Sequence, residues 1–180
     1  LIYAEDDTVF NESFATTVAG IGIERWLAED ERARQSYARD EEREQRFFEL
    51  LLNHRTRLKE VYASPESDAS KRSKKKHLLD ALLVRYDEFK GTWGGYSGYD
   101  GWMHEDLNNA KLAAIATYHD YVPAFRSILR KVDHDLSRFY AAIKALALLP
   151  EETRRQCLGA KNDYANYGGV DCPIDILGDP

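Results

Sequence analysis

Two long helical patterns fill the stretch from Glu29 to Phe89, and they limit the possible fold more than any other part of the chain. The first begins with acids that precede bases by four positions and then becomes apolar at helical spacing. Ser64-Pro65 ends it, and a second helical pattern continues to Phe89. Two long helices with a short connection predict an antiparallel helical hairpin over 29–90.

Helical patterns also occupy most of the remaining sequence. Residues 1–28 contain a helix that Asp7-Thr8 can cap, and residues 108–160 contain further helices that Pro123 interrupts. No strand pattern and no internal repeat competes with this interpretation. We therefore expect an all-α fold: a single helical domain that ends near residue 160, followed by an irregular tail over 161–180.

Residues 91–107 form a segment rich in glycine and aromatic residues, beginning "GTWGGYSGYDGW". Glycines alternating with aromatic rings indicate a loop rather than a continuous helix. Two roles remain open for this loop. Trp93 and Trp102 can pack into the core beneath it, or its rings can contact a bound peptide or sugar.

Composition excludes several classes of function. With 25 basic and 31 acidic residues the formal charge is -6, so we expect no nucleic-acid partner, and the basic run Lys71–Lys76 is interpreted as a solvated helix end. No stretch approaches the roughly 18 to 20 apolar residues that span a bilayer. The two cysteines, Cys157 and Cys172, can form at most one disulfide, and their pairing stays open.

Glu12 lies in the first turns of the N-terminal helix, within the motif "NESFA" of Asn11–Ala15. An acid at this end of a helix interacts favourably with the exposed backbone amides and the helix dipole, which is sufficient to explain it without a further role.

The neighbouring residues support a second interpretation. "NESFA" with the helix end "ERWL", Glu24–Leu27, and the block "YDGWMHEDLNNAKLAAIATYHDYVPAF", Tyr99–Phe125, resemble two segments of a family of predicted bacterial zinc-dependent aminopeptidases. The resemblance implies a gluzincin-like site in which a His-Glu-x-x-His helix supplies two zinc ligands and the general base, and Glu12 supplies the third protein ligand. It also implies a peptide substrate.

Further candidates follow from the same resemblance. Gluzincins commonly stabilise the oxyanion with a tyrosine or histidine on a later helix, so Tyr118, or His119, is a candidate for that role. Candidates for the substrate cleft are Asn11, Tyr99, Trp102, Asn108 and Asn109.

The chain departs from the family pattern in one respect. None of its five histidines lies in a His-Glu-x-x-His, and it begins Leu1-Ile2-Tyr3, where the residues after that helix are expected. We therefore expect the C-terminal part of a longer zinc enzyme, inactive and without tightly bound zinc by itself. The resemblance implies a cell-envelope or periplasmic location, with any membrane attachment through a segment upstream of Leu1. The alternative is a noncatalytic helical interaction module of the cell envelope.

Overall fold

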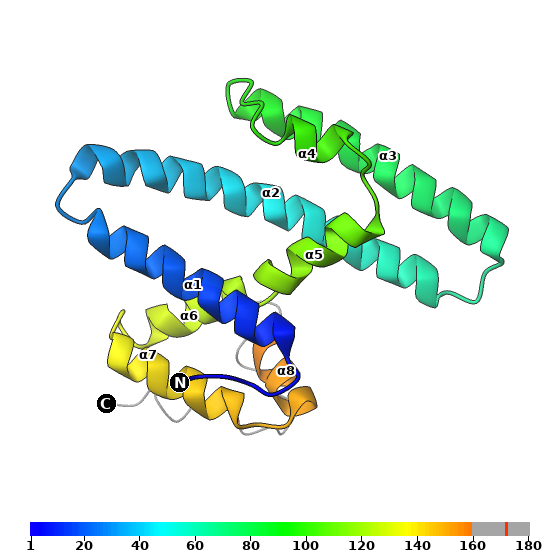
Figure 1. Ribbon diagram of the computed structural model, residues 1–180. Coiled ribbons are helices and arrows are strands. Elements are labelled where there is room, and N and C mark those ends of the chain that lie inside the picture. Colours follow the sequence, from blue (N-terminus) through cyan, green and yellow to red (C-terminus); the bar gives the residue numbers. More distant parts are fainter. Residues whose placement is uncertain (160–171, 173–180) are drawn as a thin grey trace. The chain divides into compact units, whose positions relative to one another are not determined.

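The computed structural model describes residues 1–159 and Cys172. The described residues form helices and no strands, which confirms the all-α prediction (Figure 1). The expected irregular tail, 161–180, lies outside the described residues except for Cys172. The helices are α1 (Thr8–Trp26), α2 (Glu31–Ala63), α3 (Asp68–Thr92), α4 (Asp100–His104), α5 (Asn109–His119), α6 (Val122–Lys131), α7 (Leu136–Ala147) and α8 (Glu151–Gly159).

The chain divides into two compact units, which are described separately. The first unit comprises Leu1–Arg25 and Thr117–Pro180, and the second comprises Trp26–Ala116. In the first unit, α1 shares a hydrophobic core with α6, α7 and α8. Its largest fully buried side chains are Phe10, Phe125 and Phe139, and the rings of Phe10 and Phe125 meet edge to face with centroids 5.3 Å apart. Each such ring stabilises the fold by about 1.5–3 kcal/mol through its removal from water.

The second unit is built on the predicted hairpin of α2 and α3, which run antiparallel in Figure 1. The Asp30 side chain caps α2 by accepting a hydrogen bond from the amide of Ala33. The first half of α2 is largely exposed and carries ion pairs such as Arg46 with Glu42, whereas its second half turns apolar residues inward. The predicted antiparallel hairpin is confirmed as α2 and α3. The core of this unit includes Phe47, Leu51, Leu58, Leu82, Tyr86, Met103 and Leu112.

The glycine-rich segment folds back on this hairpin. Helix α3 continues to Thr92 and ends where Gly94 and Gly95 adopt φ of +66° and +80°, and the short helix α4 follows inside the segment. Asp100 on α4 accepts hydrogen bonds from the Tyr86 hydroxyl and from the Lys90 ammonium of α3. The Lys90 bond, and next the Tyr86 bond, lower the pKa of the Asp100 carboxyl.

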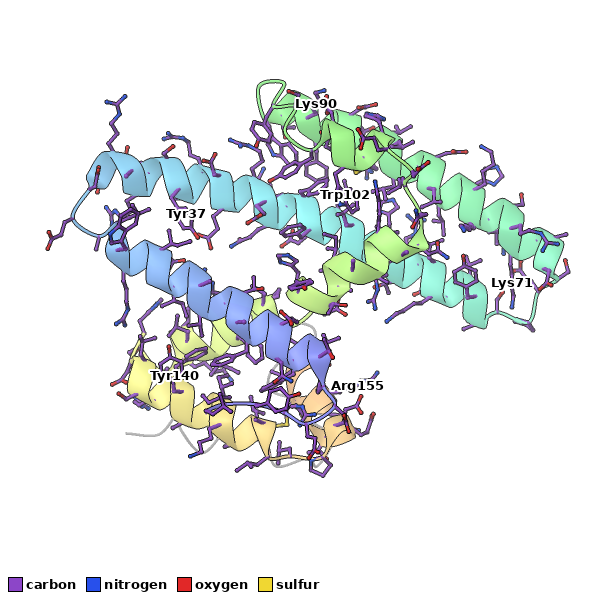
Figure 2. All side chains as sticks on the ribbon, viewed as in Figure 1. Tyr37, Lys71, Lys90, Trp102, Tyr140 and Arg155 are labelled. Carbon is purple, nitrogen blue, oxygen red and sulfur yellow. A yellow bond between two sulfur atoms is a disulfide. The ribbon has the colours of Figure 1, made fainter. Side chains whose placement is uncertain are left out.

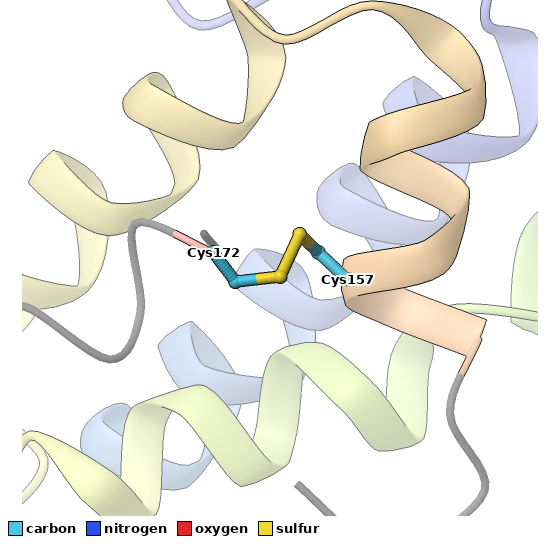
Figure 3. Close-up of a disulfide and its surroundings, with 2 residues drawn as sticks. All are labelled: Cys157 and Cys172. Atoms are coloured by element: carbon cyan, nitrogen blue, oxygen red, sulfur yellow. A yellow bond between two sulfur atoms is a disulfide. The ribbon is translucent and has the colours of Figure 1, made fainter. Parts of the chain in front are cut away.

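Cys157 on α8 and Cys172 form a disulfide (Figure 3), which answers the pairing question that the sequence leaves open. Both residues are almost fully buried and belong to the core of the first unit. Among the described residues, no helix is both long enough and apolar enough to span a membrane.

Candidate functional site

A buried ion pair fixes the start of α1, the helix that carries Glu12. The Oδ1 atom of Asp7 accepts a hydrogen bond from the amide of Phe10 at 2.9 Å and thereby caps the helix. Its Oδ2 atom accepts a hydrogen bond from Nε of Arg154 on α8 at 2.8 Å. Arg154 also donates to the carbonyl of Leu149 at 2.8 Å. The two charges are thus paired and hydrogen-bonded away from water, and they join the beginning of α1 to α8.

Asn11 holds the segment that precedes α1. Its Oδ1 atom accepts a hydrogen bond from the amide of Ala4 at 2.9 Å, and its Nδ2 atom donates to the carbonyl of Ala4 at 2.8 Å. Ala4 itself is fully buried. Asn11, expected as a cleft residue, therefore has a clear structural role in positioning the chain just before the helix.

Ser13 and Phe14 connect α1 to the other helices of the first unit. Ser13 is fully buried, and its Oγ atom accepts a hydrogen bond from the amide of Tyr121 at the start of α6, at 3.3 Å. The Phe14 ring packs on Phe125, with centroids 6.0 Å apart, and on Tyr140, at 6.2 Å. The motif residues around Glu12 therefore have structural partners on both sides.

Glu12 differs from its neighbours in the motif. Its side chain is only partly buried, and it makes no hydrogen bond or ion pair with any residue that the structure describes. Because Asp7 caps the helix, Glu12 is not needed for that purpose. A carboxylate on a well-anchored helix, without a partner among the described residues, is suited to bind a cation.

Tyr118, the predicted oxyanion stabiliser, lies near the end of α5 and is 47% exposed. No hydrogen bond joins its hydroxyl to Glu12 or to another described residue. The side chain is accessible, and its proposed role stays a prediction. The neighbouring His119 is partly buried, and this burial lowers its pKa to about 4, so it is neutral at pH 7.

Tyr121 is a residue that the sequence analysis overlooked. Its amide bonds directly to Ser13, the residue next to Glu12, and its ring packs 6.4 Å from that of Phe125. Burial, and then the charge of Asp7, raises the pKa of its hydroxyl. Its position at the break between α5 and α6, two residues before Pro123, is the sequence signal that could have marked it.

The other predicted cleft residues, Tyr99, Trp102, Asn108 and Asn109, lie in the second unit. The Tyr99 ring stacks on Phe47 with centroids 4.1 Å apart and an interplanar angle of 3°. Burial, followed by the charge of Glu44, raises the pKa of Tyr99 to about 12. The Trp102 ring, labelled in Figure 2, meets Phe47 edge to face at 5.7 Å. These contacts give both rings a packing role in the loop.

The two asparagines hold the turn before α5. Oδ1 of Asn108 accepts hydrogen bonds from the amides of Ala110, at 2.9 Å, and Lys111, at 3.2 Å, and so caps the helix. Nδ2 of Asn109 donates to the Tyr62 hydroxyl at 2.6 Å. The Oδ1 atom of Asn109 is buried and has no partner among the described residues. Capping of α5 thus accounts for the Asn108 side chain, and the bond to Tyr62 accounts for one of the two polar atoms of the Asn109 side chain.

The described residues contain no group of three histidine, cysteine or acidic side chains that could hold a metal ion. His54, for example, is buried on α2, where its Nδ1 atom lies 2.9 Å from the carbonyl oxygen of Leu50. Burial lowers the pKa of this histidine. The donor chemistry of Glu12 fits a zinc ligand, but a complete site needs ligands from outside the described residues.

Over the residues that the structure describes, these features define an all-helical fold in which α1 presents the Glu12 carboxylate without a protein partner. Residues 1–158 match the family described as "Putative aminopeptidase", and the chain belongs to this family. Comparisons with curated proteins and with solved structures found no significant match.

Proposed function

We propose that this chain is part of a zinc-dependent aminopeptidase and that Glu12 is one of its zinc ligands. The observation that carries the proposal is the contrast inside the motif: Asn11 and Ser13 are bonded to backbone groups of the protein, while Glu12 has no partner among the described residues. The family match over 1–158 supports peptidase chemistry. The remaining ligands and the general base would come from a His-Glu-x-x-His helix upstream of Leu1.

The residues of this chain would divide the work as follows. Glu12 would supply a negatively charged oxygen ligand, and Asp7, Asn11 and Ser13 would hold its helix in place. Bound zinc supplies Lewis acidity and lowers the pKa of a bound water. The Tyr118 hydroxyl, exposed on α5, would donate a hydrogen bond to the oxyanion of the tetrahedral intermediate.

Two experiments on the full-length protein test these roles. Glu12→Ala should release zinc, measured by elemental analysis after dialysis, and should abolish hydrolysis of aminoacyl-p-nitroanilides. Glu5→Ala, an exposed acid in the same unit, is the matched control and should retain both. If Glu12→Ala keeps its zinc, the assignment is wrong.

Tyr118→Phe tests the oxyanion role separately. It should lower kcat by about 100- to 1,000-fold while zinc content and KM are retained. The same loss in Tyr121→Phe with an active Tyr118→Phe would transfer the role to Tyr121.

We also propose a location outside the cytoplasm. The disulfide between Cys157 and Cys172 supports it, because disulfides persist mainly in oxidising compartments such as the periplasm.

The alternative function is a noncatalytic interaction module. The exposed, charged first half of α2 favours it, because such a surface can contact a partner protein. Full-length protein that holds no zinc and cleaves no peptide would support this alternative instead.

A further inference from the structure

The second unit contains a groove between α3 and the segment that joins α4 to α5, with a volume of about 460 Å³. Its apolar lining comes from Leu79 and Leu83 of α3, from the fully buried Met103, and from Leu107. The three leucines are only partly buried, so their side chains remain accessible in the groove.

The basic run Lys71–Lys76 lies at one end of this groove, and most of its charges are already satisfied. Lys71, labelled in Figure 2, donates to the carbonyl of Tyr62 at 2.9 Å. Lys74 pairs with Glu66, and Lys76 pairs with Asp80 at 2.7 Å. For these three cations, surface contacts of this kind are what a solvated helix end would show.

Arg72 and Lys75 are different from those three cations. Neither has a hydrogen bond or ion pair with any residue that the structure describes, and both line the groove. The two unpaired cations of the run thus lie beside the accessible leucines. Although the chain as a whole has a net charge of -6, these two cations make the groove locally attractive to an anionic group.

The length of the groove along α3 indicates what kind of ligand it can hold. Its lining extends along α3 from Arg72 to Leu83, which at 1.5 Å per residue is about 16 Å. An extended peptide advances about 3.3 Å per residue, so roughly five residues would cover this length. The opposite wall carries Asp106, whose carboxylate can accept hydrogen bonds from the backbone N–H groups of a peptide. A lipid phosphate offers no such donors, so the groove favours a peptide over an anionic lipid.

We propose that this groove binds a short extended peptide whose apolar residues lie over Leu79, Leu83 and Leu107 and whose acidic C-terminal end pairs with Arg72 and Lys75. The occupant is a peptide ending in acidic side chains and a free carboxylate. The proposal concerns binding only, and it is independent of zinc and of the role of Glu12.

Fluorescence anisotropy with fluorescein-labelled Ser-Leu-Val-Leu-Glu-Glu, carrying a free C-terminus, tests the proposal on the whole chain. The double variant R72E/K75E should weaken binding by about tenfold or more, because charge-assisted hydrogen bonds are replaced by repulsion. R32E/R39E makes the same charge change at exposed positions of α2 outside the groove and is the matched control, for which we expect a change of less than about twofold. Circular dichroism confirms that both variants fold.

Three outcomes would overturn the proposal. The acidic peptide does not bind, it binds no better than an amidated Ser-Leu-Val-Leu-Lys-Lys peptide, or both double variants weaken it equally. Sedimentation with phosphatidylglycerol vesicles is run in parallel. Vesicle binding that R72E/K75E abolishes, without peptide binding, would assign the groove to an anionic membrane surface and also overturn the proposal.

Discussion

The Nε atom of Arg154 lies 2.8 Å from Oδ2 of Asp7, and the two side chains are only 3% and 7% exposed. Removal of one partner leaves the other charge buried and unpaired. We therefore expect Arg154→Met to lower the free energy of unfolding by about 3–5 kcal/mol, measured by urea denaturation. The exposed Arg155 on the same helix provides the control, since Arg155→Met should change it by less than about 0.5 kcal/mol. Similar losses in both variants would contradict a special role for the ion pair.

Replacement of the neighbouring residues Asn11 and Glu12 by alanine should have different effects on stability. Asn11→Ala removes two hydrogen bonds to Ala4 and should lower the free energy of unfolding by about 2 kcal/mol. Glu12→Ala should change it by less than about 0.5 kcal/mol, because the carboxylate has no partner among the described residues. Thermal unfolding followed by circular dichroism measures both, and a marked destabilisation by Glu12→Ala would indicate a structural role instead.

Acid should destabilise the fold through His119. Burial lowers its pKa to about 4 in the folded chain, from an unperturbed value of 6.5. Between these values the unfolded state binds a proton that the folded state does not, so stability falls as the pH decreases from 6.5 to about 4. Because His119 is only partly buried, solvent screening reduces this loss to about 1–2 kcal/mol.

Urea denaturation over this pH range tests the prediction, and His119→Gln should flatten the profile. His77→Gln, at an exposed position of α3, is the matched control. An unchanged slope in His119→Gln would show that another group causes the acid sensitivity.

The disulfide should add stability to the first unit. Cys157 and Cys172 are 15 residues apart in sequence, and a crosslink that closes a loop of this size contributes about 3 kcal/mol. Reduction by dithiothreitol, or the double variant C157S/C172S, should lower the urea midpoint accordingly. A midpoint that reduction leaves unchanged would mean that the bridge contributes nothing to folding.

Local patterns predicted the helices well because helix caps and apolar residues at helical spacing, clearest in α6 and α7, are local signals. The cap at Asp7 and the hairpin of α2 and α3 follow from such signals. The spacing of Asp30 and Arg34 suggests an ion pair, but Asp30 bonds the amide of Ala33 and Arg34 pairs with Glu31 instead. At a helix end, the unsatisfied backbone amide is the nearer partner.

Long-range relationships were beyond the reach of these patterns. Arg154 and Asp7 are 147 residues apart, and no periodicity relates them. Nor does the sequence show that α1 shares its core with α6 to α8 rather than with the hairpin that follows it. For the candidate site, the family resemblance drew attention to Glu12, but only the structure shows that Asn11 and Ser13 are bonded within the protein.

The division into two units determines what a fluorescence experiment can detect. Trp93 and Trp102 are partly buried in the second unit, whereas Trp26, the last residue of α1, is 82% exposed, so its emission should change little on unfolding; the sequence of the first unit contains no tryptophan. Tryptophan emission therefore follows the second unit, whereas far-ultraviolet circular dichroism follows the helices of both. Any effect of Arg154 or of the disulfide that is confined to the first unit would escape an emission signal, and a difference between the two signals would reveal units that unfold separately.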